Sequence, residues 1–170
     1  MHRDVEIRAA QERAADIFRR KPGAALSTKR ASGHLSQGLV CTVHQDDYKA
    51  VMDMPPPIGG EGSAPTPGFF IRAGLAGCVA IGIKLAAARE GIAVETIDVD
   101  VDMDFDDSAL LGMGGNTAAP LETRLTITLK SAAPWSEVTA MVQRALAADP
   151  FYLALRDAQN VKVSMVPGAK

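Results

Sequence analysis

Residues 66–80 read Thr-Pro-Gly-Phe-Phe-Ile-Arg-Ala-Gly-Leu-Ala-Gly-Cys-Val-Ala, and the interpretation of the whole chain starts from this stretch. Thr66 suits a helix N-cap and Pro67 suits the first helical position. The apolar run that follows predicts a helix to about Glu90, and Gly91 is placed to be its C′ residue.

A stripe of small residues runs along this predicted helix. Gly74, Cys78 and Gly82 are spaced four residues apart and therefore share one helix face. Such a face allows another helix to approach closely, so Cys78 is either an inert packed thiol or a nucleophile held in a pocket. It lies too far from the helix N-terminus for the helix dipole to activate it. An activating cation or base must come from another part of the chain.

The composition of the 170 residues excludes several classes of function. Hydrophobic residues make up 47% and charged residues 22%, with a formal net charge of −2, which predicts one globular domain and no nucleic-acid partner. The longest apolar stretch, 69–88, is interrupted by Arg72 and Lys84, so we expect no membrane span. The N-terminus shows no signal-like apolar run, and we expect a cytoplasmic protein. The dispersed histidines predict no metal site, and no cofactor motif is present.

Periodicity predicts a single α+β domain over residues 1–170, with residues 1–22 as an N-terminal helical extension. The predicted helices are 3–20, 67–90, 136–148 with Ser136 as N-cap, and a short one directly after Pro150. The predicted strands are 39–44 and 48–53, paired as a hairpin, then 93–105, 121–130 and 161–166. A Pro/Gly loop fills 55–66, before the central helix.

The segment 93–105 alternates most regularly between apolar and acidic residues. Its apolar positions are Ile97, Val99, Val101, Met103 and Phe105, and its acidic positions are Asp98, Asp100, Asp102 and Asp104. This pattern predicts a strand with one buried face. The regular, open spacing of the carboxylates indicates a solvated face rather than a calcium cage.

The order of these elements resembles that of the OsmC/Ohr family of hydroperoxide-reducing proteins, over roughly residues 35–166. The residues that carry the resemblance are Gly59-Gly60, Pro65-Thr66-Pro67, Ala73-Gly74-Leu75-Ala76-Gly77-Cys78, Gly91-Ile92, the strand from Val94 to Val99, Pro150 through Ala154-Leu155, and Val161-Lys162-Val163. The resemblance implies a two-layer fold with an antiparallel sheet packed on two central helices. It also implies an intertwined homodimer, in which the small residues allow two helices to cross.

The resemblance further implies a thiol peroxidase mechanism in which Cys78 attacks a peroxide as thiolate and becomes a sulfenic acid. A second cysteine would then form a disulfide with it, and an arginine and a glutamate would lower the thiol pKa. The chain departs from this pattern. Asp149 stands where the second cysteine should precede a proline, Gly68 stands at the place of the glutamate, and residues 46–65 contain no arginine. The sequence therefore indicates a divergent member that lacks the second cysteine.

Two functional hypotheses remain open. In the first, Cys78 reduces organic hydroperoxides and an external thiol resolves the sulfenic acid. In the second, the dimer is catalytically inactive and holds a small apolar ligand in an interface pocket lined by Phe69, Phe70 and Cys78. Cys41 is a poor substitute for the resolving thiol, because its alternating position predicts a sheet residue.

Overall fold

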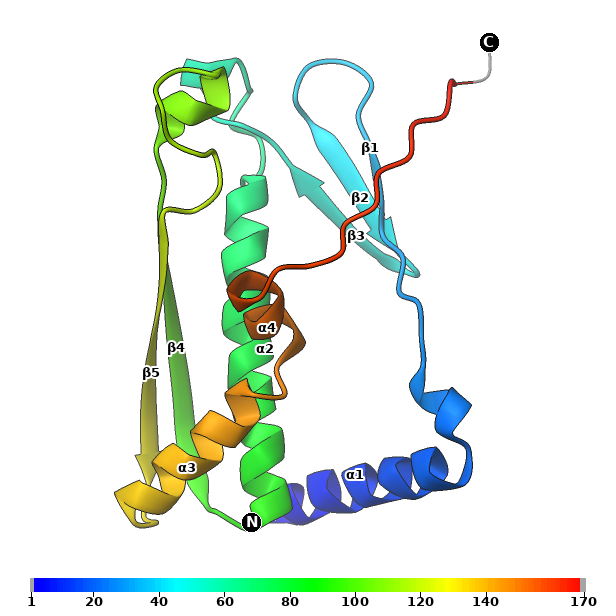
Figure 1. Cartoon of the computed structure of the whole chain (residues 1–170), viewed down its shortest axis with the longest axis vertical. Helices are drawn as coiled ribbons and strands as arrows, with labels where there is room; N and C mark the ends of the chain where they lie inside the picture. Colours follow the sequence, from blue (N-terminus) through cyan, green and yellow to red (C-terminus); the bar gives the residue numbers. More distant parts are fainter. Residues whose placement is uncertain (1, 169–170) are drawn as a thin grey trace.

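The long helix α2 (Pro67–Glu90) is the centre of the structure, a computed structural model that describes residues 2–168 (Figure 1). Its boundaries are those the sequence predicts. The Thr66 side chain accepts a hydrogen bond from the Phe69 N–H at the N-terminus. Gly91 ends the helix in the left-handed conformation with φ of 76°, which glycine adopts without strain.

The other elements form two antiparallel sheets and three further α-helices around α2. In chain order they are α1 (His2–Arg20), η1 (Pro22–Ala25), β1 (Ser32–His34), β2 (Cys41–Gln45), β3 (Tyr48–Met52), η2 (Pro56–Ile58), β4 (Val94–Asp104), η3 (Asp107–Leu111), β5 (Glu122–Ser131), α3 (Trp135–Leu146) and α4 (Pro150–Arg156). Strands β1–β2–β3 form one sheet and β4–β5 the other. The two sheets lie on different sides of α2 (Figure 1).

The core forms where α2 and α3 pack against β4–β5. Leu75, Val79 and Ile83 bury one face of α2, and Val138 and Met141 bury the facing side of α3. The apolar side chains of β4 and β5 cover this layer from the other side. This is the predicted arrangement of an antiparallel sheet packed on two helices, which confirms the α+β fold class.

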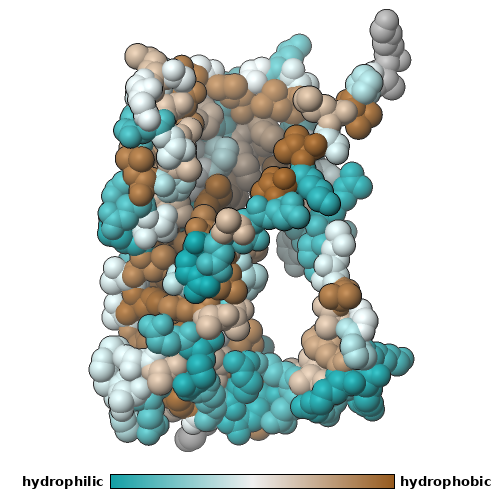
Figure 2. Space-filling view, in the orientation of Figure 1, coloured by the Kyte–Doolittle hydropathy of each residue, from teal (hydrophilic) through white to brown (hydrophobic). Residues whose placement is uncertain are grey.

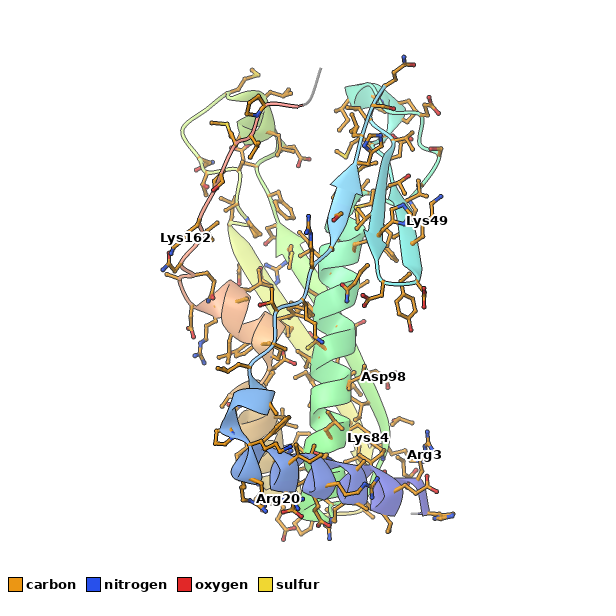
Figure 3. All side chains as sticks on the ribbon, turned by 90° about the vertical axis from the view of Figure 1, so that its right-hand side faces the viewer. Arg3, Arg20, Lys49, Lys84, Asp98 and Lys162 are labelled. Atoms are coloured by element: carbon orange, nitrogen blue, oxygen red, sulfur yellow. The ribbon has the colours of Figure 1, made fainter. Side chains whose placement is uncertain are left out.

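Strand β4 confirms the predicted alternation. Its apolar residues from Ile97 to Met103 pack toward the core, whereas Asp98 and the three acids that alternate after it are exposed. Asp98 is labelled in Figure 3. The register pairs Asp102 with Arg124 on β5, and Arg124 forms an ion pair with Asp104. The acidic face is solvated, as expected.

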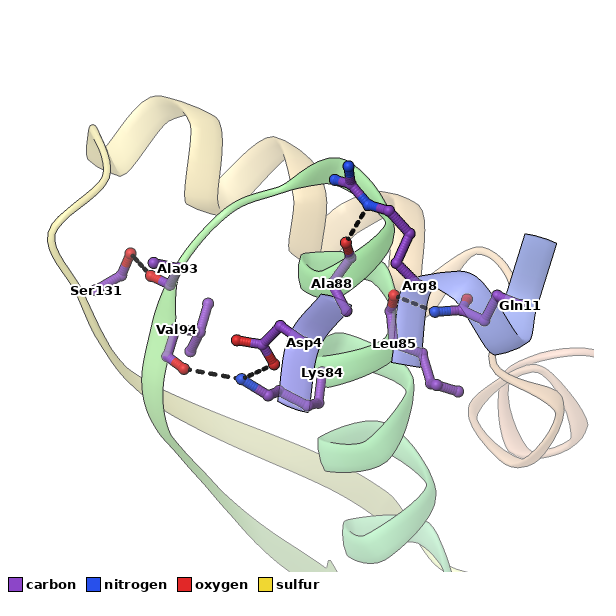
Figure 4. Close-up of polar contacts among 9 residues, drawn as sticks. All are labelled: Asp4, Arg8, Gln11, Lys84, Leu85, Ala88, Ala93, Val94 and Ser131. Atoms are coloured by element: carbon purple, nitrogen blue, oxygen red, sulfur yellow. Dashed lines mark hydrogen bonds and ion pairs between the residues drawn. The ribbon is translucent and has the colours of Figure 1, made fainter. Parts of the chain in front are cut away.

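Polar contacts fasten α1 to the C-terminal end of α2 (Figure 4). Lys84 Nζ lies 2.8 Å from Asp4 Oδ1 and donates to the Val94 carbonyl at 3.1 Å. Arg8 Nε donates to the Ala88 carbonyl at 2.9 Å, and Gln11 Nε2 donates to the Leu85 carbonyl at 3.0 Å. The Ala88 carbonyl is one of the last four of α2, which have no N–H partner within the helix itself, whereas the Leu85 carbonyl lies one turn earlier. The N-terminal extension thus supplies donors to that helix end.

The Pro/Gly loop that precedes α2 is organised by Asp53, whose side chain is 1% exposed. Its carboxylate accepts from the backbone N–H groups of Met54, Glu61 and Ser63 at 2.7, 3.1 and 2.9 Å, and from the Ser63 hydroxyl at 2.9 Å. These hydrogen bonds, with Ser63 the largest contributor, lower the pKa of Asp53 despite its burial. A Cβ on Gly60 would lie 1.7 Å from the Met54 carbonyl oxygen, so only glycine fits there.

Two sequence predictions are wrong. Residues 161–166 form no strand: they are extended but unpaired, with Val161 77% and Met165 94% exposed, because no strand edge of the same chain lies beside them. Ser136 is not an N-cap. Helix α3 begins at Trp135 and ends at Leu146, and the Pro134 carbonyl accepts from Glu137 and Val138 in the first turn. Strand β1 and the three short 3₁₀ turns were not predicted.

Candidate active site

Cys78 lies on α2 and is partly exposed. It is a free thiol, as is Cys41. Cys78 comes one residue before the buried Val79 and four residues before Gly82. Its side chain therefore lies between the side of α2 that packs in the core and the side that is exposed. The position gives the thiol both a protein neighbour and a route to solvent.

Asp149 is the protein neighbour of Cys78. It is the N-cap of α4, and its Oδ1 accepts from the N–H groups of Phe151 at 3.1 Å and Tyr152 at 2.8 Å. The residue is 3% exposed. Its second oxygen, Oδ2, is buried and has no hydrogen-bond partner among the described residues. A buried carboxylate oxygen without a partner is rare in folded proteins and calls for an explanation.

Gly82 makes room for this carboxylate on α2. A Cβ at position 82 would lie 3.3 Å from Asp149 Oδ2, closer than most such contacts in proteins. The small-residue stripe therefore has a specific local role at its C-terminal end, since it admits the Asp149 side chain against the helix next to the thiol. A larger residue would push the turn between α3 and α4 outward.

The surroundings of Cys78 disfavour its ionisation. Burial raises the pKa of the Cys78 thiol first, and the adjacent Asp149 carboxylate raises this pKa further, because a neighbouring negative charge opposes a thiolate. The Phe151 backbone N–H acts in the opposite direction and more weakly. The environment therefore holds a protonated thiol, and protonated thiols are poor nucleophiles.

The remaining residues expected at the site lie elsewhere. Cys41 is on β2, opposite Met52 in the β2–β3 pair. Phe69 and Phe70 pack edge to face, with ring centroids 5.3 Å apart, in the first turn of α2. At 1.5 Å per residue, Phe70 lies about 12 Å from Cys78 along the helix axis.

The pocket expected beside Phe69, Phe70 and Cys78 would lie at an interface with a second chain and stays a prediction. Within the chain itself, one cavity of about 380 Å³ is bordered by Glu90, Ile92, Ser136, Glu137, Ala140 and Arg144, and another of about 280 Å³ lies between α1 and the C-terminal end of α2. The Arg72 side chain points back toward Gly68. A Cβ added at Gly68 would lie 3.3 Å from Arg72 Nη1. Among the described residues, no arginine is found to act on the Cys78 thiol, whose charged neighbour is Asp149. Nor is any cluster of three His, Cys, Asp or Glu side chains within residues 2–168 placed to hold a metal ion.

One side of α2 has no cover within the chain. Ile71, Gly74, Gly77, Ile81 and Leu85, here called the open face of α2, are all exposed, with Ile81 at 63%. A Cβ added at Gly74 or Gly77 would meet nothing within 4 Å.

By length and composition α2 could span a membrane, and only 22% of its most apolar window is buried in the chain. The space-filling view shows open space between the segment that joins α1 to β1 and the rest of the molecule (Figure 2).

Sequence reasoning placed Asp149 at the position of a second cysteine but missed its role as a buried acceptor beside Cys78. The signal was present in Asp149-Pro150, since an aspartate before a proline at the first helical position is typical of an N-cap. A capping carboxylate is fixed in place. What the pattern could not reveal is that α4 would start against Gly82.

This fold agrees with a family comparison. The model of the OsmC-like protein family matches residues 60–164, and the chain belongs to this family. By sequence alone, no curated protein gives a significant match.

Solved structures share the fold at low sequence identity. An OsmC-like protein from Mycoplasma pneumoniae superposes with a TM-score of 0.65 at 16% identity, covering 76% of this chain and 88% of that one. An organic hydroperoxide resistance protein, OsmC, from Legionella pneumophila gives 0.52 at 24% identity, covering 77% and 90%. The organic hydroperoxide resistance protein OhrB of Bacillus subtilis gives 0.51 at 16% identity, covering 76% and 91%. The fold is thus that of OsmC and hydroperoxide resistance proteins.

Proposed function

We propose that the chain forms a homodimer through the open face of α2, and that this interface holds a small apolar ligand beside a Cys78 that stays protonated. The observation that carries the proposal is the open face itself. It presents exposed apolar side chains and two glycines on a helix whose opposite face forms the core. Apolar surface of this kind on a monomer marks an interaction site.

A second copy is the favoured cover for this face. The glycines Gly74 and Gly77 allow a second helix to approach closely, which a lipid surface would not require. Arg72 and Lys84 interrupt the apolar run, and Lys84 is engaged in an ion pair with Asp4 rather than free to face lipid. The unpaired extended segment 161–166 and the exposed edges of the β-sheets offer further surface to a partner chain.

The test compares two substitutions of equally exposed apolar residues. Ile81→Asp alters the open face at a residue that is 63% exposed, and Leu110→Asp is its control on η3 at 62%. Light scattering after gel filtration without detergent should show a dimer for the wild type and for Leu110→Asp, and a monomer for Ile81→Asp. The fluorescence of 8-anilino-1-naphthalenesulfonate should report an apolar site that is lost with the dimer. A monomeric wild type, or one recovered only with membranes, would refute the proposal.

A second candidate function is the reduction of organic hydroperoxides, which the partial exposure of a free Cys78 favours. The Cys78 thiolate would attack the distal oxygen of ROOH and the O–O bond would break. The alcohol ROH would leave after protonation, and a sulfenic acid would remain on Cys78. An external thiol would then condense with the sulfenic acid to a mixed disulfide and water, and a second would release reduced Cys78.

Stopped-flow measurement with cumene hydroperoxide separates the two functions. The raised pKa of Cys78 predicts a rate no faster than that of free cysteine. The same slow rate is expected for Cys78→Ser, which removes the thiol. A fast wild-type reaction that disappears in Cys78→Ser would instead establish the peroxidase.

A further inference from the structure

Asp149 presents a fixed and half-satisfied carboxylate to Cys78. Two N–H groups of the first turn of α4 hold Oδ1, so the carboxylate cannot rotate to exchange its oxygens without losing both hydrogen bonds. Oδ2 is shielded from solvent and lacks a partner among the described residues. Any group that satisfies it must therefore already be next to it inside the fold.

The surroundings of Oδ2 offer one donor. Gly82 has no side chain, and its Cα faces the oxygen with only 3.3 Å to the position of a Cβ. Four charged groups on the elements packed against α2 have partners of their own: Asp4 of α1 pairs with Lys84, Arg144 of α3 with Glu90, Arg124 of β5 with Asp104 on β4, and Arg156 of α4 with Asp157. Cys78 lies one helical turn before Gly82 on the same side of α2, which places its thiol hydrogen as the candidate donor to Oδ2. The influence of the Asp149 carboxylate on that thiol agrees with this placement.

We propose that Asp149 Oδ2 accepts the thiol hydrogen of Cys78 and thereby holds this residue in its protonated, weakly nucleophilic form. Asp149 is then a positioning residue, and it would account for the protonated Cys78 that the proposed function assumes. The physical reason is twofold. A hydrogen bond from the thiol stabilises its protonated state, and ionisation would place two negative charges side by side in a buried site.

Asp149→Asn tests this with little disturbance of the fold. The asparagine oxygen can keep both N-cap hydrogen bonds, while its Nδ2 replaces a negative oxygen with a neutral donor toward the sulfur. The experiment uses a Cys41→Ser background, so that Cys78 is the only thiol. The matched control is Asp98→Asn, which removes an equal charge from the solvated face of β4.

The readout is the rate of Cys78 alkylation by iodoacetamide between about pH 6 and pH 10, a range that spans the ordinary titration of a thiol. Asp149→Asn should move the pH profile to lower pH. Below the midpoint the rate should rise about threefold or more, because each unit of pKa changes the thiolate fraction about tenfold. The Asp98→Asn profile should match that of the parent, and in denaturant all three proteins should react alike.

An unchanged pH profile in Asp149→Asn would overturn the inference. A slower alkylation in this variant would also overturn it, because Asp149 would then be a base that promotes ionisation of the thiol. Failure of the proposed function looks different: the parent protein itself would reduce cumene hydroperoxide rapidly, or would fail to dimerise. An increase in alkylation that persists in denaturant would reflect altered intrinsic thiol chemistry and would also overturn the role assigned to Asp149.

Discussion

The two buried aspartates of this protein, Asp53 and Asp149, differ in how completely their carboxylates are satisfied. Asp53 accepts four hydrogen bonds, three from backbone N–H groups and one from the Ser63 hydroxyl. Asp149 accepts two, both on Oδ1, and leaves Oδ2 without a partner. Both side chains are almost fully buried, at 1% and 3% exposure. Burial alone therefore does not separate a structural acid from one at a candidate site.

The difference indicates what each acid is for. The Asp53 carboxylate accepts hydrogen bonds from backbone N–H groups of the loop before α2 that would otherwise be unpaired. The role of Asp53 is therefore structural. Asp149 caps a helix with one oxygen and turns the other toward a thiol. A buried acceptor without a hydrogen bond lowers the stability of the fold. Such an acceptor at a candidate site is therefore a stronger indication of function than a fully hydrogen-bonded one.

The largest effect is expected from Gly60→Ala, which tests whether the Asp53 loop is as tightly built as its hydrogen bonds imply. The new Cβ would lie 1.7 Å from the Met54 carbonyl oxygen, so the backbone itself must move. We expect a loss of about 3 kcal/mol or more in the free energy of unfolding, measured in urea. Gly23→Ala is the control, because a Cβ there meets nothing within 4 Å. Equal stability of the two variants would show that the loop is loose.

Asp53→Asn should have the next largest effect. It places an NH₂ group against the donors of Glu61 and Ser63 and should lower the thermal midpoint by several degrees, whereas exposed Asp100→Asn should not. Because the pKa of Asp53 is lowered in the folded chain, its ionised form stabilises the fold at neutral pH. That contribution is lost as the pH falls below about 4, toward the folded pKa. The wild-type advantage over Asp53→Asn should therefore shrink in acid, and an advantage that is independent of pH would contradict this account.

The same substitution at Asp149 should change stability far less. Asp149→Asn keeps the helix cap and exchanges only the weak thiol hydrogen bond proposed for Oδ2, so we expect a change within about 0.5 kcal/mol. Asp149→Ala also loses the cap and should cost about 1 kcal/mol. Urea unfolding of the three proteins measures both values. A loss in Asp149→Asn as large as that in Asp53→Asn would mean that Oδ2 has a strong structural partner other than the Cys78 thiol.

The smallest effect is expected from Ser63→Ala. It removes one of the four donors to Asp53 and leaves the three backbone N–H groups in place. A fall of about 2 °C in the thermal midpoint is expected, the ordinary result of losing one side-chain hydrogen bond. Differential scanning calorimetry resolves such a change. A much larger fall would place the hydroxyl, rather than the backbone, at the centre of the Asp53 network.

Local patterns predicted most of the elements, since helix caps and alternation act within a few residues. Thr66 and Gly91 bounded α2 correctly, and the alternation from Ile97 to Met103 identified the buried face of β4. The extended segment 161–166 shows the limit. Its alternation predicts a strand, yet a strand also needs an edge to pair with, and the single chain provides none beside it.

For the site, the sequence by itself determined that Cys78 lies on a helix of small residues and that Asp149 occupies the place of a second cysteine. Both follow from residue order and from the family resemblance. Only the tertiary structure decided that the two side chains meet, because the turn between α3 and α4 brings an N-cap carboxylate against Gly82, 67 positions earlier in the chain. The pKa of a thiol depends on the charges within a few ångströms, and such neighbours are set by packing between distant segments.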